Sequence, residues 1–155
     1  MAISATTIAT SIAALSVTGV TIKDLTGIPE AVYARDCPLL FPQPQPFMAN
    51  LRLVRQSYGT GTYKKDVLYT LRYVYLHCQV GSGRGIYDIY QDAIGKITAV
   101  IDTVLANDVL SGAIDIVPQD VINVGQLTGP PHADDEDPPL YWGCELLFEV
   151  TEFED

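Results

Sequence analysis

Apolar side chains occupy every second position near the end of the chain, in residues 140–155. The alternating set consists of Trp142, Cys144, Leu146, Phe148 and Val150. Glu145 and Glu149 lie between them, and Leu147 and Phe153 are the apolar exceptions. A period of two places alternate side chains on opposite faces of a strand. The spacing therefore predicts a long terminal strand with one face in the core and the other towards solvent or a partner.

Two further segments, residues 49–56 and 66–80, have the pattern of strands. The second is the longest strand candidate, and both of its faces are largely apolar, interrupted by Thr70 and Arg72. A strand with two apolar faces is typically covered on both sides. We therefore expect a helix on one face and another subunit or layer on the other. Shorter strands are expected at residues 17–25, 113–117 and 121–127.

Helical spacing of apolar residues predicts a short helix over residues 4–15, with Ser4 as its N-cap, and a long amphipathic helix over residues 86–105. The apolar stripe of the long helix is expected to consist of Ile86, Tyr90, Ala93, Ile97, Val100, Ile101, Val104 and Leu105. The order of helix, strands, helix and strands, with short connections, predicts an α+β fold. Its mainly antiparallel sheet would pack against the long helix, with the shorter helix at the N-terminus.

Proline interrupts these patterns in two places, an extended segment over residues 28–47 and an acidic loop over residues 128–139. Because proline fixes φ and lacks an amide donor, we expect no interior strand or helix in the first segment. Gly59 and Gly61 predict a hairpin tip between two strands. With 155 residues, no repeat and no interdomain linker, residues 1–155 are predicted to form a single domain.

Composition and charge narrow the classes of function. The chain is 48% hydrophobic and carries a net charge of −10. That charge disfavours general binding to a phosphate backbone, but it lets DNA pass an acidic surface without adhering. No apolar run reaches the roughly 18 residues that span a bilayer. No basic residue precedes Lys23, so we expect no secretory signal and a cytoplasmic setting.

The residues that most often carry catalysis lack the spacing that catalysis requires. The glycines of residues 81–85 match neither the P-loop nor the dinucleotide pattern, which favours a strand-to-helix connector. His77 and Cys78 are adjacent on a predicted strand and would face opposite sides, and His132 lies far away in the proline loop. We therefore predict no catalytic residue, no cofactor and no enzymatic activity.

Charged residues gather at two places. The acidic run of residues 134–137 has ligand chemistry suited to a hard cation but not the required spacing, so we predict a solvated loop and no metal. Four of the nine basic residues lie near the predicted hairpin, namely Arg52, Arg55, Lys64 and Lys65. They fit either a solvated hairpin tip or an interface in which the basic hairpin of one copy meets the acidic surface of the next. A head-to-tail contact of this kind closes into a ring when the rotation permits.

Several segments resemble the small tail-completion proteins of long-tailed bacteriophages. Residues 19–25 (GVTIKDL), 28–30 (IPE) and 37–42 (CPLLFP) resemble their N-terminal part. The helix at 87–107, the strand after it and residues 141–143 (YWG) continue the resemblance. It implies a tail terminator, with a sheet flanked by helices and a ring, usually of six copies, on the head-proximal end of the tail tube. That ring stops tube growth, presents a surface to the head connector and lets DNA pass through its lumen.

The favoured hypothesis is therefore a structural virion protein of the tail neck, assembled in the host cytoplasm. Its expected partners are itself, a tail-tube protein and a head-connector or neck protein, with DNA only in the lumen and no membrane. The basic hairpin residues would form the subunit or tube contact. The acidic lumen or partner surface would consist of Asp134, Asp135, Glu136, Asp137, Glu145, Glu149 and Glu152. The alternatives are a head-closure, tail-tube or minor tail protein, or a small ligand-binding or enzymatic domain that uses His77 or His132.

Overall fold

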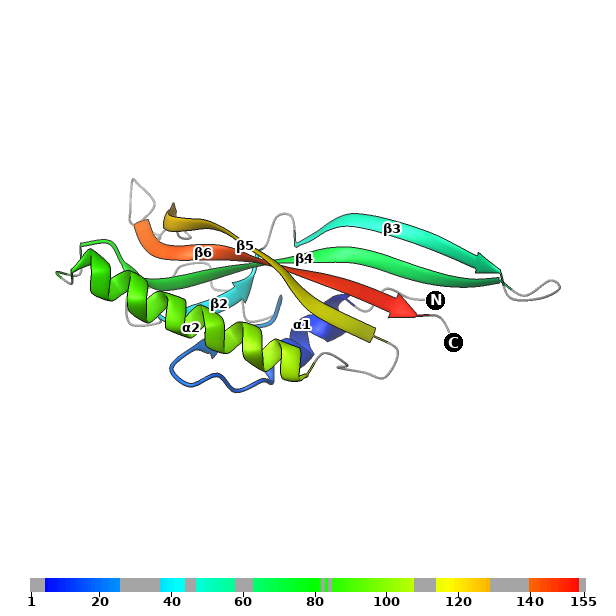
Figure 1. Ribbon diagram of the computed structural model, residues 1–155, viewed down its shortest axis with the longest axis horizontal. Coiled ribbons are helices and arrows are strands. Elements are labelled where there is room, and N and C mark those ends of the chain that lie inside the picture. Colours follow the sequence, from blue (N-terminus) through cyan, green and yellow to red (C-terminus); the bar gives the residue numbers. More distant parts are fainter. Residues whose placement is uncertain are drawn as a thin grey trace.

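The computed structural model describes residues 5–25, 37–43, 47–57, 63–81, 83, 85–107, 114–128 and 140–153. They form two helices and six strands (Figure 1). In chain order the elements are α1 (Ala5–Ala13), β1 (Thr21–Ile22), β2 (Leu39–Pro42), β3 (Met48–Ser57), β4 (Tyr63–Gln79), α2 (Ile86–Ala106), β5 (Ile114–Thr128) and β6 (Leu140–Phe153). One long helix, one short N-terminal helix and a mostly antiparallel sheet confirm the predicted α+β class.

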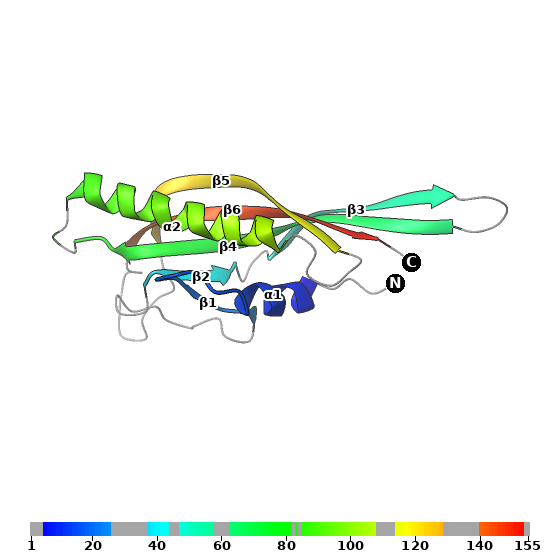
Figure 2. The same ribbon diagram turned by 60° about the horizontal axis from the view of Figure 1, so that its bottom comes forward.

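The strands form one sheet in the order β1-β2-β4-β6-β5, and β3 pairs separately with β4. Every pair is antiparallel except β1 with β2. β2 pairs with residues 73–76 of β4 and β3 with residues 63–71, so β2 and β3 lie end to end along the same edge of β4. The far ends of β3 and β4 project beyond both helices (Figures 1 and 2). We call residues 52–57 and 63–68, which pair continuously there, the hairpin arm.

Both helices cover the same face of the sheet, and the main core lies between them and the long strands β4 and β6. From the strands this core takes Tyr69, Leu71, Tyr73, Tyr75, Cys144, Leu146, Phe148 and Val150. From the helices it takes Ala5, Ile8, Ile12, Ala93, Ile97, Val100 and Val104. The predicted alternation along β6 is confirmed, because its even-numbered positions from Cys144 to Val150 are buried in this core.

The apolar stripe of α2 differs from the prediction at its ends. Ile89 was left out of the prediction and is 3% exposed, whereas Ile86 and Leu105 are 61% and 48% exposed. The buried positions are Ile89, Ala93, Ile97, Val100 and Val104. This narrower row repeats every three or four residues and follows one line along the helix. The two exposed residues lie in the terminal turns of the helix, so periodicity alone did not distinguish them from core positions.

The prediction that the proline-rich segment holds no interior strand is wrong at β2. This strand is buried at all four positions and lies between β1 and β4. Its prolines occupy positions that need no donor. Pro38 precedes the strand and its carbonyl accepts a bond of 3.0 Å from the Thr21 amide, while Pro42 is the last residue of the strand. On this second face of the sheet Leu39, Phe41, Leu76 and Tyr141 form a smaller core.

The two short strands expected at 113–117 and 121–127 are one continuous strand, β5. Its pairing with β6 shifts between Pro118 and Asp120 and again between Ile122 and Gly125. These β-bulges accommodate a proline and a glycine that would otherwise end a strand. The expected Ser4 cap, residues 28–36 and 44–46 of the proline-rich segment and the acidic loop of residues 129–139 lie outside the described residues. Among the helices that the structure describes, none is both long and apolar enough to cross a membrane.

Candidate functional site

The hairpin arm carries the four basic residues singled out in the sequence. Arg55 lies directly opposite Lys65, Lys64 lies one register position further out, opposite Gln56, and Arg52 lies opposite Leu68. In the part of the chain that the structure describes, β6 pairs with β4 as far as Asp66, and residues 55–57 and 63–65 pair only with each other. The arm thus holds four basic residues of the chain, which favours a negatively charged partner.

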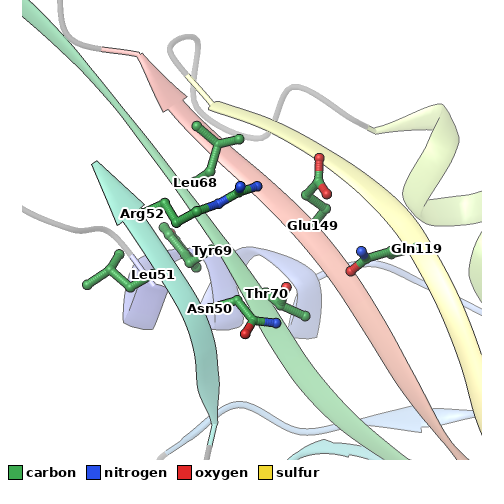
Figure 3. Close-up of a pocket in the computed structure, with 8 residues that line it drawn as sticks. All are labelled: Asn50, Leu51, Arg52, Leu68, Tyr69, Thr70, Gln119 and Glu149. Carbon is green, nitrogen blue, oxygen red and sulfur yellow. The ribbon is translucent and has the colours of Figure 1, made fainter. Parts of the chain in front are cut away.

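A polar hollow opens on the face of the sheet that the helices do not cover (Figure 3). It has a volume of about 360 Å³ and is lined from all four strands that meet there. Arg52 comes from β3, Thr70 from β4, Gln119 from β5 and Glu149 from β6. It offers one cation, one carboxylate, a hydroxyl and side-chain amides, which suits hydrogen bonding to a polar protein surface.

Two β-bulges shape this hollow. One shifts the β3–β4 register between Ala49 and Arg52, and the other shifts the β5–β6 register between Pro118 and Asp120. The bulge residues Asn50 and Gln119 line the hollow. Asn50 has a φ of 55°, a left-handed conformation that asparagine tolerates better than most residues. The sequence analysis missed both positions, and their only signal was an asparagine and a Pro-Gln pair within strand patterns.

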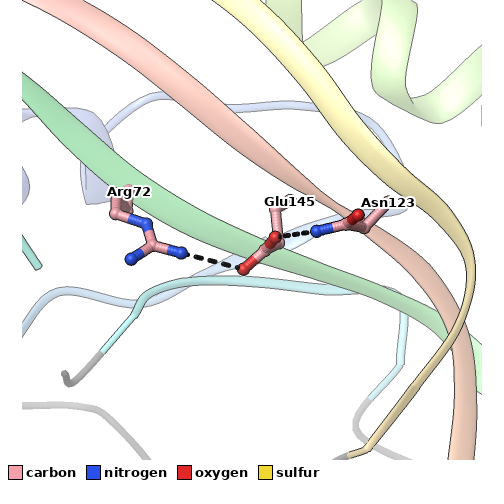
Figure 4. A network of polar contacts seen from close by, with 3 residues as sticks. All are labelled: Arg72, Asn123 and Glu145. Carbon is pink, nitrogen blue, oxygen red and sulfur yellow. Dashed lines mark hydrogen bonds and ion pairs between the residues drawn. The ribbon is translucent and has the colours of Figure 1, made fainter. Parts of the chain in front are cut away.

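Glu145 takes part in an interstrand polar network rather than projecting freely (Figure 4). Its Oε1 lies 3.3 Å from Nη2 of Arg72, and its Oε2 accepts a short hydrogen bond from Nδ2 of Asn123. The side chains of Arg72 and Glu145 are 24% and 13% exposed. Asn123 lies at the second bulge of β5 and also has a positive φ, 53°. Glu145 thus connects β4, β6 and β5, so its charge is already matched within the subunit.

The three glutamates of β6 do not share one surface. Glu149 is exposed and lines the hollow, whereas Glu152 is only 4% exposed. Its assignment to an exposed acidic surface is therefore corrected. The physical reason is the period of two, because position 152 is even like Val150 and faces the core side. Burial, together with the neighbouring Glu152 carboxylate, raises the pKa of Tyr69 well above its usual range. Asp134, Asp135, Glu136 and Asp137 lie outside the described residues.

A second polar group connects α2 to β4. His77 is 3% exposed, its Nδ1 lies 2.7 Å from the hydroxyl of Tyr75, and its Nε2 lies 3.2 Å from Oδ2 of Asp92. Burial raises the pKa of Tyr75, and Asp92 adds to the effect, so the hydroxyl keeps its proton at neutral pH. This arrangement fastens the helix to the sheet.

The thiol of Cys144 lies fully buried in the main core. Burial, with a smaller contribution from Glu145, raises the pKa of Cys144 to about 12. Because the thiolate is the nucleophilic form, this thiol is inert at neutral pH. Within the described residues, no group of three or more His, Cys, Asp or Glu side chains is arranged to hold a metal ion. His132 lies outside those residues.

No protein-family model and no curated protein sequence matches the chain. The likeness to tail-completion proteins therefore rests on the sequence segments described above.

Proposed function

We propose that this protein is a structural virion subunit that forms a ring at the head-proximal end of a long phage tail tube. The ring stops tube growth and joins the tail to the head connector. The observation that carries this proposal is the hairpin arm, a projecting ribbon that gathers four of nine basic residues on a chain of net charge −10. The sequence resemblance supplies the place of the ring in the virion.

The outer part of the arm, residues 55–57 and 63–65, pairs with no other described strand. An isolated two-stranded hairpin is at best marginally stable in water. Leu53, near the base of the arm, is 68% exposed although it is a large apolar residue. Contact with another molecule would bury such a side chain and would place the basic residues against negative charge. The remainder of each copy is acidic, so a second copy is the simplest such partner.

A basic arm on one side and an acidic body on the other make a head-to-tail contact, because the two contacting surfaces differ. Such heterologous contacts generate a closed ring when the rotation closes and a filament when it does not. In the proposed ring the acidic surfaces that remain free would line the lumen or meet the tube and connector. DNA would pass through without strong binding, since excess negative charge opposes contact with phosphates.

The proposal is tested by native mass spectrometry of the purified chain over a rising concentration, with electron microscopy of the heaviest species. We expect a closed ring, of six copies if the resemblance holds. Filaments as the only assembly would overturn the terminator role and favour a tail-tube subunit. The Lys64→Glu/Lys65→Glu double variant should fold normally but fail to assemble or to join tails. Lys23→Glu, which changes an exposed lysine outside the arm, serves as a control for altered net charge.

A further inference from the structure

The sheet has two free edges at the base of the hairpin arm, where residues 52–54 of β3 lie level with residues 151–153 of β6. There the strand order is β3-β4-β6-β5, so β3 and β5 are the outer strands. Among the described residues β3 pairs only with β4 and β5 only with β6. Each outer strand therefore has one edge whose backbone amides and carbonyls have no partner strand. Such an edge is a template for pairing with another chain.

These two strands also carry much of the exposed apolar surface. The structure has ten exposed large apolar side chains among the described residues, and five of them lie on β3 and β5. They are Leu51, Leu53, Val117, Val121 and Val124. Four of the other five lie on α2. Apolar residues on a sheet edge are a liability in a monomer, because they invite association.

The charges of the two edges are complementary. β3 carries Arg52 and Arg55 and no acidic residue, whereas β5 carries Asp115 and Asp120 and no lysine or arginine. Pairing β3 with β3, or β5 with β5, across a twofold axis would bring like charges together. Pairing β3 with β5 brings opposite charges together. Charge therefore selects the heterologous contact over the twofold one.

The strand directions agree with this choice. Each neighbouring pair in β3-β4-β6-β5 is antiparallel, so β3 and β5 run in opposite directions. When copies follow one another side by side with the same orientation, β3 of one copy meets β5 of the next as an antiparallel pair. Antiparallel pairing is the more stable pattern and continues the arrangement of the sheet.

The bulges of β5 and its Pro118 would ordinarily protect an edge from such pairing. They interrupt only part of the strand. In β5, residues 114–117 keep a regular register with β6 before the first bulge. In β3, residues 52–57 keep a regular register with β4 after the bulge between Ala49 and Arg52. Each edge thus retains a regular segment of at least four residues.

We propose that β3 of one copy pairs with β5 of the next copy, so that the sheets join edge to edge around the assembly. The partner of this surface is a second copy of this chain. Closure of the assembly into a ring rests on the proposed function, whereas the strand pairing applies to a ring or a filament.

Hydrogen exchange of the unaltered chain tests the pairing directly. Amide exchange is measured below and above the concentration at which the chain assembles. We expect exchange to slow at least about tenfold in both residues 52–57 and residues 114–117, because new interstrand bonds protect edge amides. Protection confined to other segments in the assembled state would overturn the proposal while leaving the ring itself intact. A chain that stays monomeric at every concentration would also overturn the strand pairing. That result would not by itself exclude the terminator function, since a terminator can assemble on its tube.

Charge reversal provides a second test. Arg52→Glu/Arg55→Glu and Asp115→Lys/Asp120→Lys should each raise the half-assembly concentration at least about tenfold, and mixing the two variants in equal amounts should restore assembly with the variants in alternation, because every β3 edge then meets a β5 edge of opposite charge. Combining all four changes in one chain should bring the concentration back to within about threefold of the unaltered protein, since the charges are then exchanged between the two edges. Asp102→Lys, an exposed reversal on α2, is the control. If the half-assembly concentration of the fourfold variant is raised by the product of the two separate effects, the two edges do not contact each other.

Discussion

Replacing Gly143 with alanine should strongly destabilise the fold. Gly143 lies on β6 opposite Leu76, next to the register shift between Leu76 and Cys78. A Cβ at this position would lie 1.9 Å from the carbonyl oxygen of Tyr75, 3.0 Å from its carbonyl carbon and 3.2 Å from Cα of Leu76. All three are backbone atoms of the central strand β4, so no side-chain rotation relieves the overlap.

The magnitude follows from what must move. Separating β4 from β6 by enough to admit a methyl group disturbs the longest strand and the adjoining core residues Tyr75 and Leu76, both 0% exposed. Overpacking a tight interior typically costs about 1–3 kcal/mol and occasionally more. Because the clash is with backbone in the sheet centre, we expect a loss at or above the upper end, about 3 kcal/mol. Urea denaturation followed by circular dichroism measures this loss as a lower midpoint at an unchanged slope.

The matched control is the same substitution at Gly95 on α2. An added Cβ there has no neighbour within 4 Å, and the residue lies within the helix. Alanine exceeds glycine in helix propensity by about 1 kcal/mol, so Gly95→Ala should raise the free energy of unfolding by up to that amount. A lower free energy of unfolding for Gly143→Ala and a higher one for Gly95→Ala would support the close approach of β4 and β6 at Gly143. A loss at Gly143 below about 1 kcal/mol would refute the close approach of β4 and β6 at this position.

Two further predictions concern the charged and titrating groups. Arg72→Ala should lower the free energy of unfolding by about 1 kcal/mol, since it removes a half-buried ion pair with Glu145; a double-mutant cycle with Glu145→Gln that shows no coupling energy would contradict the network. For Cys144, burial raises the pKa from 9.0 to about 12, so the folded state keeps the proton that the unfolded state loses. Its contribution to stability should therefore be complete below about pH 9 and decline as the pH rises towards 12. Cys144→Ala should flatten this alkaline decline in a pH series of unfolding curves, and native Cys144 that reacts with iodoacetamide at pH 8 as fast as a free thiol would exclude the buried site.

Much of the secondary structure was predictable because it depends on side chains that are near neighbours in the chain. The alternation along β6, the long strand β4 and the extent of α2 follow from periods of two and of three to four residues. The β3–β4 hairpin followed from the glycines between two strand patterns. The same period of two also placed Glu152 on the core face, yet its charge led to the opposite assignment. In that case the pattern was the better guide than the residue type.

Other features were not predictable because they depend on contacts between distant segments. Whether the prolines around β2 forbid an interior strand depends on which amides β1 and β4 present to it. Whether Pro118 ends β5 depends on a bulge that keeps pairing with β6 on both sides. The polar hollow arises from two bulges on β3 and β5, which β4 and β6 separate, and the Tyr75–His77–Asp92 group joins a strand to a helix. None of these leaves a local signal.

The sequence by itself determined the fold class, the long strands, the long helix and the concentration of basic residues at one hairpin. These features depend on periodicity and charge, which are set by residues that are close together in the sequence. Only the tertiary structure decided that β3 and β5 are the two free edges, that their charges are opposite in a strand order that makes them antiparallel, and that Glu145 is matched within the subunit. Strand order and register result from packing the apolar faces of β4 and β6 under two helices. That packing depends on the whole chain, because each of its contacts joins segments that are far apart in the sequence.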